Sequence, residues 1–174
     1  MIRVALAGAL LATPLPVAAK VASVGEAGMV VENEAFVAAP PAAVWAVLIE
    51  PKRWWQAAHS WSGKAENFSL DLRAGGCFCE SLPGGGSVEH LRVVYADPGK
   101  LLRLTGGLGP LQGDAATGPL SWTLQPDGQG TRIVQRYAVS GVARTPWPVM
   151  APLIDSVLRQ QLDSLAKTIA SLRK

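Results

Sequence analysis

The residues best suited to chemistry are acidic and basic side chains on the two arms of a predicted hairpin. Glu80 precedes a glycine-rich turn at residues 84–86, and Glu89, His90 and Arg92 follow it. A carboxylate beside an imidazole orients the ring and stabilises its protonated form, which is what proton transfer requires. These side chains are therefore candidates for a polar anchor or a general acid–base dyad at a cavity wall. The alternative is a solvated outer face.

The register of this hairpin decides between the interpretations. If residues 84–85 form the turn, Glu80 pairs with Glu89. If residues 84–86 form the loop, Glu80 faces His90 instead. Because side chains alternate along a strand, a slip of one residue exchanges an acid–base pair for two facing carboxylates.

Two cysteines lie on the strand that leads into the turn. Cys77 and Cys79 are separated by Phe78, so both thiols point to one face of the strand. Their Cα atoms lie about 6.5–7 Å apart in an extended strand, at the edge of disulfide reach. We expect two small apolar side chains packed under a helix. The alternatives are a redox disulfide and a metal site with His90, which lacks a fourth ligand.

Aromatic side chains offer an apolar surface, and Trp55 and Trp61 are among them. Large rings with a single N–H suit either core packing or the lining of a ligand pocket. We predict an apolar pocket in which Glu80 or His90 makes the polar contact. The residues expected around this pocket are Trp54, Phe68, Phe78, Glu80, His90 and Trp122.

Motifs for cofactors and for self-sufficient catalysis are missing from the sequence. The glycines at residues 84–86 are not followed by the Lys-Ser/Thr of a phosphate loop. The glycines at residues 106–109 precede no predicted helix and do not fit a dinucleotide fingerprint. No nucleophile elbow or metalloprotease helix motif occurs. We therefore expect no cofactor, no metal and no assignable catalytic residue, and leave open whether the protein is an enzyme.

The composition is that of one ordinary globular domain. Of 174 residues, 49% are hydrophobic and 17% are charged, which argues against disorder and coiled coil. Sixteen basic and 13 acidic residues leave a net charge of +3, and the basic residues are scattered singly, so no nucleic-acid partner is expected. Two cysteines and two histidines nearly exclude a structural zinc module.

Residues 1–19 have the pattern of a secretory signal peptide. Arg3 supplies a positive start, residues 4–12 are apolar, and small side chains at residues 17–19 suit signal peptidase. The apolar segment is too short for a stable membrane anchor, and no later segment is long enough to span a bilayer. We predict cleavage after Ala19 and a periplasmic or secreted domain of residues 20–174.

The remaining sequence predicts an α+β domain. Alternating apolar and polar residues, bounded by Gly and Pro, predict strands at residues 30–39, 68–72, 77–82, 87–95, 101–105, 119–125 and 131–140. Two short helices are expected after the first strand, beginning near Pro41 and Pro51, and a long loop at residues 106–118.

A long amphipathic helix is expected to close the chain. Residues 149–172 carry apolar side chains at steps of three and four, which form a stripe that can lie on a sheet. These are Ile154, Leu158, Leu162, Leu165, Ile169 and Leu172. Helices on one face of a curved antiparallel sheet leave room for a cavity between them.

This order of elements resembles the START-like (SRPBCC, helix-grip) superfamily, particularly relatives of the C-terminal domain of the heat-shock-protein-90 ATPase activator. The similarity covers residues 30–172 and implies a curved antiparallel sheet wrapped around a long C-terminal helix. Its matching positions are Phe36-Val37, residues 40–45, Leu48, Pro51, Trp54-Trp55, residues 72–76, Phe78, Pro98, Leu101 and Gly130-Thr131.

The resemblance implies a fold more strongly than a function, because the superfamily holds binding proteins, cyclases and co-chaperones. We favour an exported protein that binds a small hydrophobic molecule, lipid-like or polyketide-like, between the sheet and the C-terminal helix. One alternative is a cyclase- or dehydratase-like enzyme that uses Glu80, His90 or Arg92. The other is a surface interaction module, although an exported protein would not meet a cytosolic chaperone.

Overall fold

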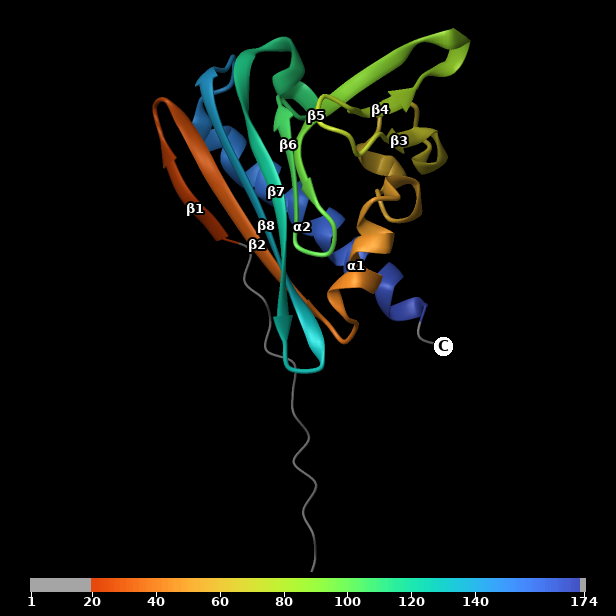
Figure 1. The fold of residues 1–174 in the computed structure, drawn as a ribbon. Coiled ribbons are helices and arrows are strands. Elements are labelled where there is room, and N and C mark those ends of the chain that lie inside the picture. The colour runs from red at the N-terminus through yellow and green to blue at the C-terminus, as the bar shows by residue number, and fades with distance from the viewer. Residues whose placement is uncertain (1–19, 173–174) are drawn as a thin grey trace, which may run out of the picture.

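The computed structural model describes residues 20–172, so the predicted signal peptide lies outside the described residues. These residues form one eight-stranded antiparallel sheet in the order β1-β2-β8-β7-β6-β5-β4-β3. The long helix α2 crosses behind the bent sheet, and α1 lies beside its C-terminal half (Figure 1). The predicted α+β helix-grip fold is confirmed.

The strands are β1 (Lys20–Gly25), β2 (Gly28–Val37), β3 (Phe68–Leu70), β4 (Cys77–Ser81), β5 (Ser87–Asp97), β6 (Leu101–Gly106), β7 (Ala115–Asp127) and β8 (Gly130–Val142). The α-helices are α1 (Pro41–Leu48) and α2 (Trp147–Ser171). Short 3₁₀ helices are η1 (Pro51–Arg53), η2 (Ala57–His59), η3 (Ala65–Asn67), η4 (Pro83–Gly85) and η5 (Gly109–Gly113).

Hydrophobic periodicity explains the largest elements. Strand β2 buries Met29, Val31, Ala35 and Val37 at every second position, together with the polar Asn33. In the α2 stripe, the predicted side chains from 154 to 169 are buried against the sheet, as expected. They are Ile154, Leu158, Leu162, Leu165 and Ile169.

Leu172 does not belong to this stripe. The helix ends at Ser171, and the Leu172 side chain is exposed.

Two other expectations about the elements are wrong, and the sequence analysis does not identify strand β1. The second expected helix is only a series of single 3₁₀ turns. Strand β7 begins at Ala115, inside the segment expected to be a loop. Its glycine content was misleading, because Gly118 is needed in the strand: a Cβ there would lie 1.8 Å from the carbonyl oxygen of Ala138.

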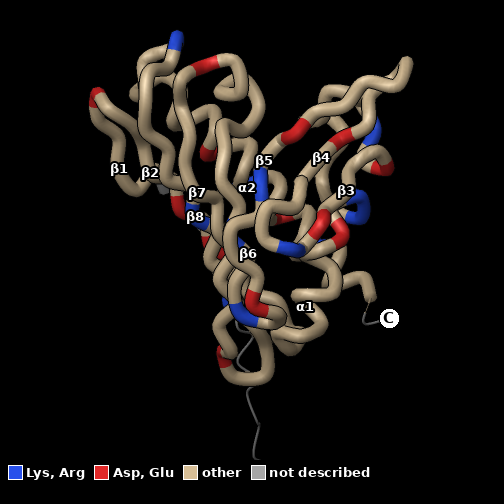
Figure 2. Tube along the Cα trace, turned by 45° about the horizontal axis from the view of Figure 1, so that its top comes forward, with Lys and Arg blue, Asp and Glu red and all other residues tan. Residues whose placement is uncertain are grey.

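Acidic and basic residues are interspersed along the described chain, and both kinds occur in most parts of the fold (Figure 2). Exposed ion pairs of the sheet include Arg136 with Glu32 and Arg132 with Asp127. Such surface pairs each contribute at most about 1 kcal/mol. Among residues 20–172, no helix has the length and apolar character that a membrane span needs.

Candidate functional site

The β4–β5 hairpin has a register that neither sequence interpretation anticipated. Ser81 pairs with Ser87, and Glu80 pairs with Val88. The connection therefore takes in residues 82–86, where Gly84 and Gly85 have φ angles of 78° and 86°. Glycine adopts such angles without strain, so the two glycines suit the sharp bend inside this five-residue connection.

A β-bulge in β5 turns His90 inward. Phe78 pairs with Leu91 and Cys79 pairs with Glu89, so His90 is an extra residue without a partner on β4. In a regular strand His90 and Leu91 would face opposite sides, but both are buried here. The bulge therefore places the imidazole on the inner side, with the Glu80 side chain.

The two inward polar side chains form a hydrogen-bonded pair. The Nε2 atom of His90 lies 2.9 Å from Oε2 of Glu80, and their side chains are only 3% and 0% exposed. Oε2 also accepts the backbone N–H of Trp61 at 3.1 Å, and Oε1 accepts that of Ser62 at 2.5 Å. Burial alone would raise the pKa of Glu80, but the hydrogen bonds from Ser62, Trp61 and His90 together hold it below its usual value.

His90 is neutral at physiological pH in this environment. Burial lowers its pKa, and the nearby Glu80 carboxylate only partly opposes that effect. Because an ionised carboxylate can only accept, Nε2 of the imidazole carries the proton and Nδ1 carries the lone pair. The ring stacks on Phe68 with centroids 4.9 Å apart. This arrangement can accept a hydrogen bond or a proton at Nδ1, with Glu80 stabilising the charge.

A cavity of about 270 Å³ opens beside His90. Its other walls come from the segment before β3, from the loop between β6 and β7, and from α2. They consist of Trp55, His59, Ser60, Trp61, Leu108, Gly109, Pro110 and Val157. A second cavity of about 200 Å³ shares Leu108, Gly109, Pro110 and Val157 and is lined only by apolar residues and glycine. The two cavities are therefore neighbours along α2.

Buried polar contacts hold the loop that forms one wall. The hydroxyl of Tyr137 accepts the N–H of Leu108 at 2.9 Å and donates to the carbonyl oxygen of Gly106 at 2.8 Å. Burial raises the pKa of Tyr137 to about 12, so the hydroxyl keeps its proton.

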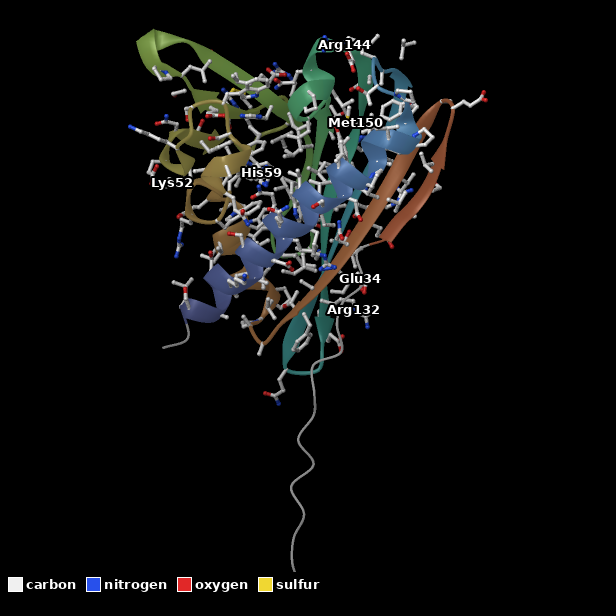
Figure 3. All side chains as sticks on the ribbon, turned by 180° about the vertical axis from the view of Figure 1, so that it is seen from behind. Glu34, Lys52, His59, Arg132, Arg144 and Met150 are labelled. Atoms are coloured by element: carbon white, nitrogen blue, oxygen red, sulfur yellow. A yellow bond between two sulfur atoms is a disulfide. The ribbon has the colours of Figure 1, made fainter. Side chains whose placement is uncertain are left out.

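Glutamines of α2 hold the opposite wall. The N–H of Gln56 donates to Oε1 of Gln161 at 2.9 Å, and its side chain donates to the carbonyl oxygen of Gln160 at 2.9 Å. His59 lies beside the middle of α2 (Figure 3), with Nε2 3.2 Å from Oε1 of Gln160. The segment of residues 56–62 thus joins α2 to Glu80 through Trp61 and Ser62.

The aromatic residues predicted to surround the pocket lie next to it, in the packed core. The ring centroids of Trp54 and Trp122 are 6.3 Å apart, and those of Phe68 and Phe78 are 5.4 Å apart. The space beside Trp54, Phe78 and Trp122 is only about 10 Å³. Of the six predicted residues, His90 lines the larger cavity and Glu80 supports it from behind. The ligand-binding role of all six stays a prediction.

Sequence reasoning missed most of the cavity lining. The sequence marks Trp55 and Trp61 as apolar aromatic surface without placing them at the pocket, and no motif points to His59, Pro110 or Val157. Val157 is an apolar residue of α2 that lies outside the buried stripe. An apolar side chain beside the core-facing stripe of a predicted helix is the one signal that could have identified it as a cavity residue.

Glu89 and Arg92 face away from the cavity. Their exposed side chains form an ion pair with each other, and Arg92 also donates to the carbonyl oxygen of Gly75 at 2.8 Å. Of the four polar residues in the hairpin, two are thus buried and two are solvated, and Arg92 is not positioned for chemistry with Glu80 and His90.

The expectation for the cysteines is wrong. Cys77 and Cys79 form a disulfide with Cα atoms 5.3 Å apart, and both are half-buried on the face opposite Phe78 and Glu80. They do not pack under a helix, because β4 turns Phe78 and Glu80 toward the core. Disulfide-bonded sulfurs are not thiolate ligands. Among the described residues, no three His, Cys, Asp or Glu side chains group as a metal site would require.

Comparison with known proteins identifies the family. Residues 29–170 match the family model described as polyketide cyclase / dehydrase and lipid transport. The chain belongs to this family. The resemblance to the START-like (SRPBCC) superfamily is thereby confirmed. Curated proteins give no significant match.

Solved structures that are similar to this chain confirm the fold. CalU16 from Micromonospora echinospora is 18% identical, with 82% of this chain and 77% of that chain covered and a TM-score of 0.55. Mll3558 from Rhizobium loti is 19% identical, with coverage of 81% and 96% and a TM-score of 0.59. NE0264 from Nitrosomonas europaea is 18% identical, with coverage of 83% and 96% and a TM-score of 0.57. At these identities the likeness is one of fold alone.

Proposed function

We propose that this protein binds a small, mainly apolar molecule in the cavity beside His90. The observation that carries the proposal is a cavity of about 270 Å³ with mostly apolar walls and one inward imidazole. Ligand sites in proteins are typically concave and apolar, with a few placed polar groups that fix the orientation of the ligand. The adjoining apolar cavity along α2 extends the space for an acyl chain or a ring system. Membership of a family that includes lipid transport agrees with such a ligand.

The chemistry of the walls indicates what the ligand carries. Trp55, Leu108 and Val157 offer apolar surface, and each Å² removed from water contributes about 25 cal/mol. Nδ1 of His90 is an acceptor, so it suits a hydroxyl or phenol donor on an otherwise apolar molecule. The apolar area supplies most of the affinity, and His90 supplies orientation.

Filling the cavity is expected to weaken binding strongly. Val157→Trp places a large ring in the wall shared by both cavities. A fluorescent fatty-acid analogue is then expected to bind at least about tenfold more weakly. The loss of about 55 Å² of buried apolar ligand surface is enough to weaken the affinity by that factor. Titration followed by tryptophan fluorescence measures the affinity.

The matched control makes the same change elsewhere on α2. Val149 is 56% exposed and lines neither cavity, so Val149→Trp is expected to leave binding unchanged. Equal affinities for the two folded variants, or saturable binding by neither variant nor the wild type, would contradict the proposed cavity site.

A second candidate function is proton-transfer catalysis, and the buried Glu80–His90 pair favours it. In this hypothesis Nδ1 of His90 removes a proton from a C–H next to a carbonyl group, and Glu80 stabilises the imidazolium. An aryl methyl ketone in deuterated water would then exchange its α-hydrogens faster with the protein than without it. His90→Gln is expected to abolish this exchange and to change the affinity little. Wild-type exchange at the background rate would leave only the binding function. The surface interaction module stays a prediction.

We also propose that the protein is exported to the periplasm or secreted. The signal-like residues 1–19 support this, and so does the Cys77–Cys79 disulfide, because disulfides persist in oxidising compartments. N-terminal sequencing of protein purified from its host is expected to begin at Lys20. Recovery of the chain with Met1 intact would contradict export.

A further inference from the structure

The disulfide of β4 is poorly suited to stabilising the whole domain. It joins Cys77 to Cys79, which are only two positions apart. In the chain-entropy model a disulfide stabilises by restricting the unfolded chain, and the effect grows with the number of residues in the closed loop. A loop that encloses only Phe78 restricts almost nothing. The chain's only two cysteines therefore form a bond whose effect is local.

The local effect acts on the part of β4 that positions the candidate site. The Cα atoms of the two cysteines are 5.3 Å apart, compared with about 6.6 Å across two residues of an extended strand. The disulfide thus holds β4 contracted. The irregularity in the β4–β5 pairing lies between Phe78 and Cys79, opposite the bulged His90. The contraction and the bulge occupy the same place in the sheet.

The contracted segment carries two of the contacts that hold the imidazole. Phe78, between the two cysteines, packs against the His90 ring with centroids 5.4 Å apart. Glu80, which directly follows Cys79, holds Nε2 of His90 at 2.9 Å. A change in the length of β4 at the disulfide therefore moves both partners of His90 relative to β5.

A reductant can approach this bond without entering the cavity. Both cysteines are half-buried on the outer face of the sheet, whereas the cavity lies on the inner face. Arg92 and Glu89 lie directly opposite Cys77 and Cys79 and form an exposed ion pair on that outer face. The disulfide is therefore approached across a solvated surface whose two charges balance each other.

We propose that Cys77 and Cys79 form a reversible redox site that sets the position of His90 and thereby the ligand affinity of the cavity. The reductant is a dithiol. One of its thiolates attacks a sulfur of the disulfide to give a mixed disulfide, and its second thiol then displaces the cysteine. Two electrons pass to the protein, which gains two thiols, and the reductant leaves as a disulfide. The effect on ligand affinity rests on the proposed binding function, whereas the effect on His90 does not.

The two histidines of the chain provide an internal control for the test. Imidazole NMR signals are recorded for the oxidised protein and after dithiothreitol, with iodoacetamide trapping and mass spectrometry to count free thiols. The signals of His90 are expected to shift on reduction and to return on reoxidation. Those of His59, which is bound to Gln160 on the opposite wall, are expected to stay in place. The affinity for the fluorescent fatty-acid analogue is expected to change at least threefold.

A variant without the disulfide isolates its role. Cys77→Ser/Cys79→Ser is expected to give the His90 signals and the affinity of the reduced wild type. Neither the signals nor the affinity of this variant should change when dithiothreitol is added. His90 signals that are identical in the two redox states, or a disulfide that resists excess dithiothreitol in the folded protein, would overturn the proposal. Both of these measurements use the wild-type protein alone, so the proposal can still be tested if the variant does not fold. Shifted His90 signals without probe binding in either state would contradict the binding function but not the redox coupling.

Discussion

Leu162→Ala is expected to lower the free energy of unfolding by about 2–5 kcal/mol. Leu162 is 0% exposed and lies in the middle of the α2 stripe that covers the inner face of the sheet. Removing its side chain loses buried apolar area and leaves a cavity that the packed strands can only partly fill. Chemical denaturation followed by tryptophan fluorescence measures the change, because it reports the unfolding of the whole domain.

A leucine on the same helix provides the control. Leu153 is 59% exposed, so Leu153→Ala is expected to change the stability by no more than about 0.5 kcal/mol. A denaturation midpoint that is unmoved by Leu162→Ala would show that α2 does not hold the fold together.

Elements with a clear period could be predicted from the sequence, because their side chains meet one continuous surface. The two-residue period of β2 and the three-to-four-residue steps of α2 each report a single buried face. The same reasoning placed Cys77 and Cys79 on one face of β4. It could not tell which face is buried, because the opposite face presents Phe78 together with a carboxylate.

The burial of that carboxylate depends on a distant segment. The amides of Trp61 and Ser62 satisfy Glu80 from positions 19 and 18 residues earlier in the chain, and no periodicity reports such a contact. The orientation of His90 likewise depends on a bulge, which inserts one residue and breaks the alternation on which strand predictions rest.

The cavity itself was the least predictable feature. Most of its walls are 3₁₀ turns and loops, and their positions depend on a few tertiary hydrogen bonds, such as those of Tyr137 and Gln161. The aromatic residues expected to line it fill the neighbouring core instead, because large rings gain more by packing on one another than by facing an open space.

The second large effect is expected from Glu80→Ala, which should destabilise the protein at pH 7 by about 3 kcal/mol or more. The change removes the acceptor for three hydrogen-bond donors, the N–H groups of Trp61, Ser62 and His90. Each donor left without a partner in the interior costs about 1–3 kcal/mol. Chemical denaturation of wild type and variant at the same pH measures the difference.

The dependence on pH should follow from both members of the pair. The pKa of His90 in the folded protein is below its ordinary value of 6.5, so its contribution to stability is complete above about pH 6.5 and is lost as the pH falls toward the lower folded value. The pKa of Glu80 is below its ordinary value of 4.5, so its contribution is lost as the pH falls through its folded pKa. Both losses occur on the acid side.

The variant and a matched control separate these two contributions. Glu80→Ala should enlarge the loss of stability that begins near pH 6.5, because the carboxylate that opposes burial is gone and the pKa of His90 falls further, but should lack the loss that Glu80 causes below about pH 4.5. The stability difference from wild type should therefore widen as the pH falls from about 6.5 and should shrink only as Glu80 of the wild type becomes protonated. Glu89→Ala removes an exposed carboxylate from the opposite strand and should change the stability by at most about 0.5 kcal/mol. Equal effects of the two substitutions would mean that Glu80 is solvated, and the buried pair, the candidate site and its acid–base chemistry would all have to be abandoned.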